Sequence, residues 1–159
     1  MNDGSIHISV QPVWGTVRNM RYKIRKLLEE FGVEIIYASE IVASELLENA
    51  IKYGTAVPEL SSVEFHFEYS PKEIIISVRN GVIEESENFK IFKLYIDNLI
   101  RSEEPQTLYI NRLKEIIENP EDEGSRLGLY RIPFETDYLL SYRVENNVLE
   151  VTAICKIQD

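Results

Sequence analysis

Glu45, Asn49 and Lys52 are the residues of this sequence whose types and spacing best suit chemistry. Steps of four and three residues place them on one face of an α-helix, one turn apart. There the Glu45 carboxylate could act as a general base, and the Asn49 amide oxygen could ligate Mg²⁺. An ordinary solvated helix face would have the same composition, so both interpretations stay open on the spacing alone.

The helix that carries these residues is predicted from about Ser39 to Tyr53, with Gly54 as its C-terminal cap. Its apolar residues gather on the opposite arc, at about 100° per residue, which indicates burial against a core. An earlier helix over residues 17–31, ended by Gly32 in a left-handed conformation, carries five of the 17 basic residues on its polar face. That face is either solvated or a contact surface for an acidic partner.

Alternating and apolar runs predict strands around these helices, joined in two hairpins. The run at 74–78 is almost continuously apolar, which is typical of a strand in the middle of a sheet. We expect strands at 6–10, 63–69, 74–78, 139–144 and 148–157, helices at 89–99 and 108–117, and a short helix after 124 that Pro133 stops. This order predicts one α+β domain over 1–159, a two-layer sandwich whose mixed sheet is covered by helices on one face.

Three segments of the chain resemble the motifs of one superfamily. Residues 38–54 resemble the asparagine box of the GHKL superfamily, the histidine kinase-like ATPases. Residues 74–81 are similar to the strand and first glycine box, and residues 124–130 to the second, where glycine-rich backbone holds phosphates. The resemblance implies a Bergerat-type fold that binds ATP and Mg²⁺, with Glu45 as the base and Asn49 on the metal. It also implies nucleotide contacts from Asn49, Lys52, Arg79, Asn80, Gly81, Gly124, Arg126 and Gly128.

The sequence departs from this family pattern at three places. Arg79 aligns with the aspartate that accepts the adenine amino proton, although arginine can only donate. Ile83 and Arg126 align with glycines that let the backbone approach the ligand. Each lost hydrogen bond costs roughly 1–3 kcal/mol, so we expect a degenerate nucleotide site. Arg126 could instead bind a phosphate itself, because its guanidinium matches phosphate oxygens.

The motif order is most similar to that of bacterial partner-switching regulators, the anti-sigma-factor serine kinases and their relatives. No segment resembles the histidine-bearing dimerisation helix of sensor kinases, so a complete sensor kinase is not expected. We expect a regulator that binds a protein partner, such as a sigma factor or the antagonist of an anti-sigma factor, alone or as a homodimer. The alternatives are an active ATP- and Mg²⁺-dependent serine/threonine kinase or anti-sigma factor, and an α+β domain unrelated to nucleotides.

Composition narrows the class of partner and the compartment. The formal charge of −10 disfavours nucleic acid, since phosphate backbones would be repelled. No run approaches the roughly 18 apolar residues of a membrane span, so a soluble cytoplasmic protein is expected. The single cysteine, Cys155, and the two histidines offer no recognisable metal-ligand spacing, and Cys155 is expected to be a buried core thiol.

Overall fold

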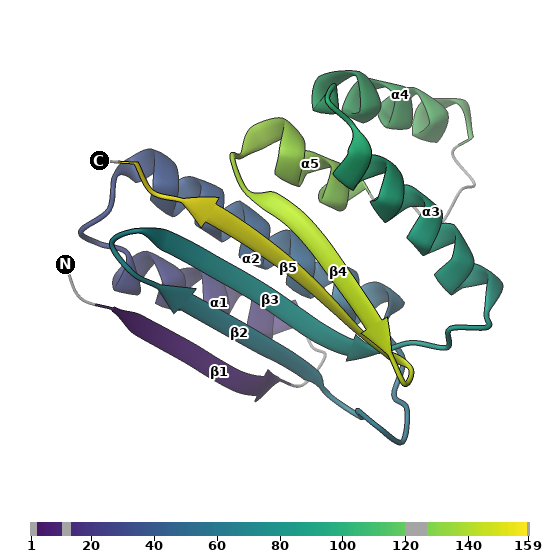
Figure 1. Cartoon of the computed structure of the whole chain (residues 1–159), viewed down its shortest axis with the longest axis horizontal. Coiled ribbons are helices and arrows are strands. Elements are labelled where there is room, and N and C mark those ends of the chain that lie inside the picture. Colours follow the sequence, from purple (N-terminus) through teal and green to yellow (C-terminus); the bar gives the residue numbers. More distant parts are fainter. Residues whose placement is uncertain (1–2, 11–13, 120–126, 159) are drawn as a thin grey trace.

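The computed structural model describes residues 3–10, 14–119 and 127–158 (Figure 1). Within these residues the chain forms five strands and five helices. In chain order they are β1 (Gly4–Val10), α1 (Trp14–Leu27), α2 (Val33–Tyr53), β2 (Val63–Tyr69), β3 (Glu73–Gly81), α3 (Glu87–Arg101), α4 (Pro105–Glu118), α5 (Leu127–Glu135), β4 (Leu139–Glu145) and β5 (Val148–Lys156). The predicted α+β class is confirmed.

The strands form one sheet in the order β1-β2-β3-β5-β4. The predicted mixed sheet is wrong, because every neighbouring pair of these strands is antiparallel. Tight hairpins join β2 to β3 and β4 to β5, which makes each of these pairs antiparallel. Between β1 and β2 the chain runs through two helices, α1 and α2, so it enters β2 in the direction opposite to β1. The apolar strand β3 is central, as its composition predicted.

In the view of Figure 1, helices α1 and α2 form a second layer behind the sheet, and α3 and α4 lie beyond its β4 edge. Helix α2 packs against β2 and β3, α1 packs against α2, and α5 joins α2 to β4 and to α4. The arrangement is compatible with a two-layer sandwich. No helix in the described parts of the chain is long and apolar enough to cross a membrane.

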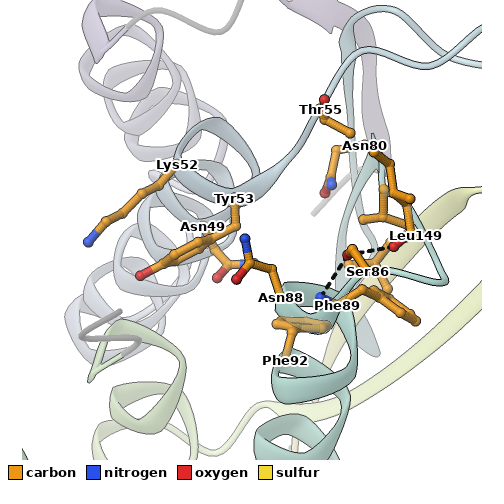
Figure 2. Close-up of a pocket in the computed structure, with 12 residues that line it drawn as sticks. Asn49, Lys52, Tyr53, Thr55, Asn80, Ser86, Asn88, Phe89, Phe92 and Leu149 are labelled. Carbon is orange, nitrogen blue, oxygen red and sulfur yellow. Dashed lines mark hydrogen bonds between the residues drawn. The ribbon is translucent and has the colours of Figure 1, made fainter. Parts of the chain in front are cut away.

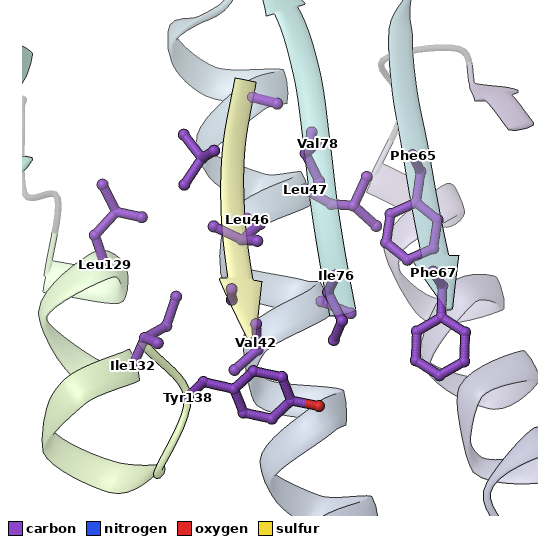
Figure 3. Packing of buried hydrophobic residues seen from close by; sticks show 14 of the residues in the cluster. Val42, Leu46, Leu47, Phe65, Phe67, Ile76, Val78, Leu129, Ile132 and Tyr138 are labelled. Atoms are coloured by element: carbon purple, nitrogen blue, oxygen red, sulfur yellow. The ribbon is translucent and has the colours of Figure 1, made fainter. Parts of the chain in front are cut away.

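The core lies between these two layers (Figure 3). Alternate side chains of β2 and β3 point toward α2, and burying each large one contributes about 1.5–3 kcal/mol to stability. Tyr138 is fully buried beside α2 and its hydroxyl lies 2.7 Å from the Ser39 hydroxyl. Figure 3 labels further members of this buried cluster: Val42, Leu46, Leu47, Phe65, Phe67, Ile76, Val78, Leu129 and Ile132. Cys155 is also buried, as predicted.

Helix α2 begins at Val33, six residues before the predicted start. Its first turns are exposed at Val33 and Tyr37, so they lack the apolar periodicity that marks the buried part. Gly54 is the C-cap of this helix, as predicted. Gly32 has a φ value of −65°, so the left-handed conformation predicted for it is wrong. The absence of a side chain at Gly54 also lets Asn80 of β3 approach the end of α2 closely, as described below.

Helix α5 continues two residues beyond Pro133, so the predicted stop at this proline is wrong. A proline removes one backbone donor and need not end a helix when other contacts hold the next turn. Arg131 donates to Glu135 at 2.8 and 3.1 Å, and the Thr136 amide donates to the Ile132 carbonyl at 3.0 Å. These bonds carry the helix past Pro133.

Candidate functional site

A cavity of about 300 Å³ lies where the C-terminal end of α2 meets the end of β3 and the start of α3 (Figure 2). Its polar lining includes Asn49 and Lys52 from α2, Asn80 from β3 and Ser86 from the start of α3. The structure thus brings together three of the predicted site residues, Asn49, Lys52 and Asn80. They come from segments that are about 30 residues apart in the sequence.

Two glycines allow β3 to end against the loop that follows α2. A Cβ atom on Gly81 would lie 2.1 Å from the Thr55 carbonyl oxygen, and the Thr55 amide donates to the Gly81 carbonyl at 2.9 Å. A Cβ atom on Gly54 would lie 3.0 Å from Nδ2 of Asn80. Gly81 does not line the cavity in the described structure, so its visible role is to permit this packing.

Asn80 is the residue of β3 that reaches the cavity. Its side chain is buried, and Nδ2 donates to the Gly81 carbonyl at 3.0 Å, which fixes the orientation of the amide. Because successive residues of a strand point to opposite faces, Arg79 lies on the other side of the sheet. There Arg79 donates to Glu64 at 2.6 Å and lies 3.7 Å from Glu150. The structure therefore does not bring Arg79 to the cavity.

Glu45 points toward α5 and does not line the cavity in the described structure. Its Oε1 accepts a hydrogen bond of 2.7 Å from Nη1 of Arg131. A Cβ atom on Gly128 would lie 1.8 Å from Oε2, so the first turn of α5 rests on the carboxylate. With only 9% of its surface exposed, Glu45 is held between two helices in an ion pair. Gly128 thus lies beside Glu45 and does not line the cavity in the described structure.

Burial governs the protonation of this ion pair. It raises the pKa of the Glu45 carboxyl above its ordinary value of 4.5, and the charge of Glu48 raises that pKa further. The guanidinium of Arg131 opposes this shift without cancelling it. Burial also works against the charge of Arg131, but the hydrogen bond with Glu135 and the charge of Glu45 outweigh it and raise the Arg131 pKa.

The cavity itself is poor in positive charge. Among its described lining residues Lys52 carries the one positive charge, and its Nζ lies over the Tyr53 ring at 5.2 Å from the centroid. The remaining lining is uncharged and combines polar side chains such as Thr55 and Asn88 with the apolar Val82, Phe89 and Leu149. These amide and apolar surfaces suit a small uncharged ligand better than a triphosphate.

The predicted phosphate contacts from Gly124 and Arg126 fall on positions outside the described residues. The metal prediction rests on Asn49, whose side chain faces the cavity in Figure 2. Within the described part of the chain, no group of three or more histidine, cysteine, aspartate or glutamate residues could hold a metal ion. A magnesium ion here would therefore depend on oxygens from a ligand in addition to the Asn49 amide.

No protein-family model matches this chain, and no curated protein matches its sequence. The resemblance to the GHKL superfamily therefore remains a prediction.

The main residue that the sequence-based analysis missed is Arg131. Its spacing of four from Glu135 is a readable signal for a helical ion pair. Its second partner, Glu45, is 86 residues away, and this contact follows only from the packing of α5 on α2.

Proposed function

We propose that this chain is a regulatory protein of the partner-switching type, with a Bergerat-type fold, that acts by binding a protein partner while its nucleotide site is degenerate. The observation that carries the proposal is the engagement of Glu45. A general base must reach the proton that it removes, directly or through one water. The Glu45 carboxylate is instead bonded to Arg131 at 2.7 Å and covered by Gly128.

The departures at the cavity support the same proposal. Arg79, which stands where the family has its adenine-reading aspartate, pairs with Glu64 on the opposite face of the sheet. Asn49 and Asn80 still line a cavity, but Lys52 is the one cation among its described lining residues. A triphosphate needs several positive or backbone donors, and the described lining of the cavity offers few of them.

The face of α1 is our candidate for the partner-binding surface. Arg25 donates to the buried Glu40 through Nε at 2.9 Å and Nη2 at 3.1 Å, which ties α1 to α2. Arg18 and Arg21 are exposed and form no ion pair with any described residue. Together with Tyr22, which is 63% exposed, they border a groove of about 430 Å³ between α1 and α2.

An acidic segment of a protein partner fits this groove best. The groove is lined by Arg18 and Arg21 against one carboxylate, Glu48, since Glu40 is bound by Arg25. On a chain with a formal charge of −10, these arginines beside an exposed tyrosine form a local site for negative charge. Arginine and tyrosine are also the residue types that contribute most to protein interfaces. The groove could thus bind an acidic helix or extended segment.

Fluorescence anisotropy with a labelled glutamate-rich peptide of about 12 residues tests this surface. The double variant Arg18→Glu/Arg21→Glu should weaken binding at least about tenfold, because two attractive contacts become repulsive. The matched control Lys93→Glu/Lys114→Glu makes the same change in net charge on the exposed faces of α3 and α4. Equal loss of binding in both variants would mean that only the net charge matters, and the α1 surface would be rejected.

The second candidate is an active ATP- and Mg²⁺-dependent serine/threonine kinase or anti-sigma factor. One observation favours it: Asn49, Lys52 and Asn80 share a cavity, and Glu45 has the raised pKa that general bases often have. Calorimetric titration with ATP and Mg²⁺ separates the two candidates. We expect no saturable heat at millimolar ATP. Saturable binding that Asn49→Ala abolishes and the exposed control Asn111→Ala retains would instead establish the kinase.

A further inference from the structure

The outer face of the sheet, opposite the helices, is patterned in rows that run across the strands. Helices α1 and α2 lie behind the other face, and α3 and α4 lie beyond the β4 edge, so alternate residues of each strand point outward here (Figure 1). In the antiparallel register, outward residues of neighbouring strands stand directly opposite each other. Three of these rows form one continuous surface.

The first row is a ladder of four alternating charges. Arg143, Glu150, Arg79 and Glu64 are paired in register across β4, β5, β3 and β2. Arg143 donates to Glu150 at 3.4 Å, Glu150 lies 3.7 Å from Arg79, and Arg79 donates to Glu64 at 2.6 Å. The ladder is neutral as a whole, in contrast to the chain.

On β4, β5 and β3 the second row is apolar and the third is small, and on β2 these rows continue as Glu68 and His66. Leu139, Ile154 and Ile75 are paired in register across β4, β5 and β3, and Leu139 is 74% exposed. Between this row and the charge ladder lie the hydroxyl residues Thr152 and Ser77. They form part of the floor of a trough of about 650 Å³ that the flanking rows border.

This pattern is complementary to itself. Consider a two-fold axis that runs parallel to the strands in front of the sheet, between β3 and β5. A copy turned about it would place β3 against β5 and β2 against β4 of its partner. Arg143 would then face Glu64 of the partner subunit, and Arg79 would face Glu150 of the partner subunit, because reversing an alternating ladder exchanges its signs. Ile154 would meet Ile75 of the partner subunit.

We infer that the outer face of the sheet binds a second copy of this chain in a two-fold symmetric homodimer. Two-fold contacts need a surface that is complementary to itself. The charge ladder and the contact of Ile154 with Ile75 of the partner subunit satisfy this for one axis, whereas Leu139 would face Glu68 of the partner subunit at the edge of the surface. Sheets that pack face to face lie about 10 Å apart, with their strand directions within about 30° of each other. This spacing suits a surface on which the small residues Thr152 and Ser77 lie between two rows of larger side chains. This surface is separate from the α1 face and from the cavity.

Sedimentation equilibrium with pairs of charge reversals tests the dimer. The wild type should show a concentration-dependent mass that rises to twice 18.5 kDa. Arg143→Glu places a carboxylate opposite Glu64 of the partner subunit, and Glu64→Arg places a guanidinium opposite Arg143 of the partner subunit. Each variant alone should dimerise roughly tenfold or more weakly than the wild type, because both symmetric contacts become repulsive.

Mixing the two variants supplies the control for folding. In the mixed dimer, Glu at position 143 of one subunit meets Arg at position 64 of the other, and the second contact keeps the wild-type pair of Glu64 with Arg143 of the partner subunit. Both contacts are then attractive, so an equimolar mixture should recover the dimer mass. A variant that merely misfolds would not be rescued, and circular dichroism checks each fold. Arg21→Glu, on α1, should leave the dimer unchanged. A wild type that stays monomeric at millimolar concentration, an Arg143→Glu variant that dimerises normally, or a mixture without recovery would each overturn the inference.

Discussion

Replacing Arg131 by methionine should destabilise the fold in a way that depends on pH. The substitution keeps most of the side-chain volume but leaves the Glu45 carboxylate, 9% exposed, without its 2.7 Å partner. Removing one member of a fully buried ion pair costs about 3–5 kcal/mol. Because a third of the Arg131 side chain is exposed, we expect a smaller loss of about 2 kcal/mol at pH 8. For a domain of this length, that loss lowers Tm by roughly 4–8 °C.

The sign of the pH effect follows from the raised pKa of Glu45 in the folded state. A carboxyl whose folded pKa lies above its unfolded pKa contributes most to stability below the unfolded value, and this contribution is lost as the pH rises through the folded value. Without Arg131 the folded pKa rises further. The difference in unfolding free energy between the wild type and Arg131→Met should thus be small near pH 4.5 and grow toward pH 8.

Urea denaturation at several pH values measures these differences, and a double-mutant cycle with Glu45→Gln isolates the pair. In the Glu45→Gln background, Arg131→Met should cost much less, since no buried carboxylate remains. Arg18→Met provides a control at an exposed arginine. A cost that is equal at pH 5 and pH 8, or unchanged by Glu45→Gln, would refute the assignment of Glu45 to a structural ion pair.

Two further substitutions test the packing around the site. Gly81→Ala should cost about 1–3 kcal/mol of unfolding free energy, since the new Cβ would lie 2.1 Å from the Thr55 carbonyl oxygen. The control Gly15→Ala on α1 meets nothing within 4 Å and should be neutral or stabilising by up to about 1 kcal/mol. Equal effects of the two variants in chemical denaturation would contradict this packing. Arg25→Ala should lower the midpoint of urea denaturation, because it leaves the buried Glu40 without this partner, while Arg21→Ala should leave the midpoint nearly unchanged. Similar midpoints for both variants would remove the Arg25 contact as a link between α1 and α2.

Local patterns in the sequence predicted most of the elements. The alternation in β2 and the apolar run of β3 predicted the hairpin and the central strand, because each residue's burial follows directly from the two-residue period. The exposed first turns of α2 carry no such pattern, so its start was misplaced. The antiparallel sheet depends on how the helices return the chain, which periodicity does not encode.

The candidate site was predictable only in part. Asn49 and Lys52 share a helix face, so their common position at the cavity follows from spacing. Glu45 shares that spacing but turns toward Arg131, because α5 packs beside its turn of α2. Long-range partners such as Arg131 for Glu45, and the pairing of the buried Arg112 with the Tyr95 ring, arise from tertiary packing between separate helices.

Strand parity also decides which residue of a motif reaches the cavity. The sequence comparison aligned Arg79 with a position that reads adenine, yet the pleat of β3 turns Arg79 outward and Asn80 inward. A shift of one residue in a strand moves a side chain to the other face of the sheet. The residue types alone do not show whether Arg79 or Asn80 faces the cavity.

The most direct test of the central claim is a residue-resolved titration of the ¹⁵N-labelled protein with ATP and Mg²⁺. We predict that the side-chain amide signals of Asn49 and Asn80 stay in place up to millimolar nucleotide. A saturable shift of both signals, absent when Mg²⁺ is removed and absent from the exposed Asn111, would contradict a degenerate site and would establish that this cavity binds nucleotide.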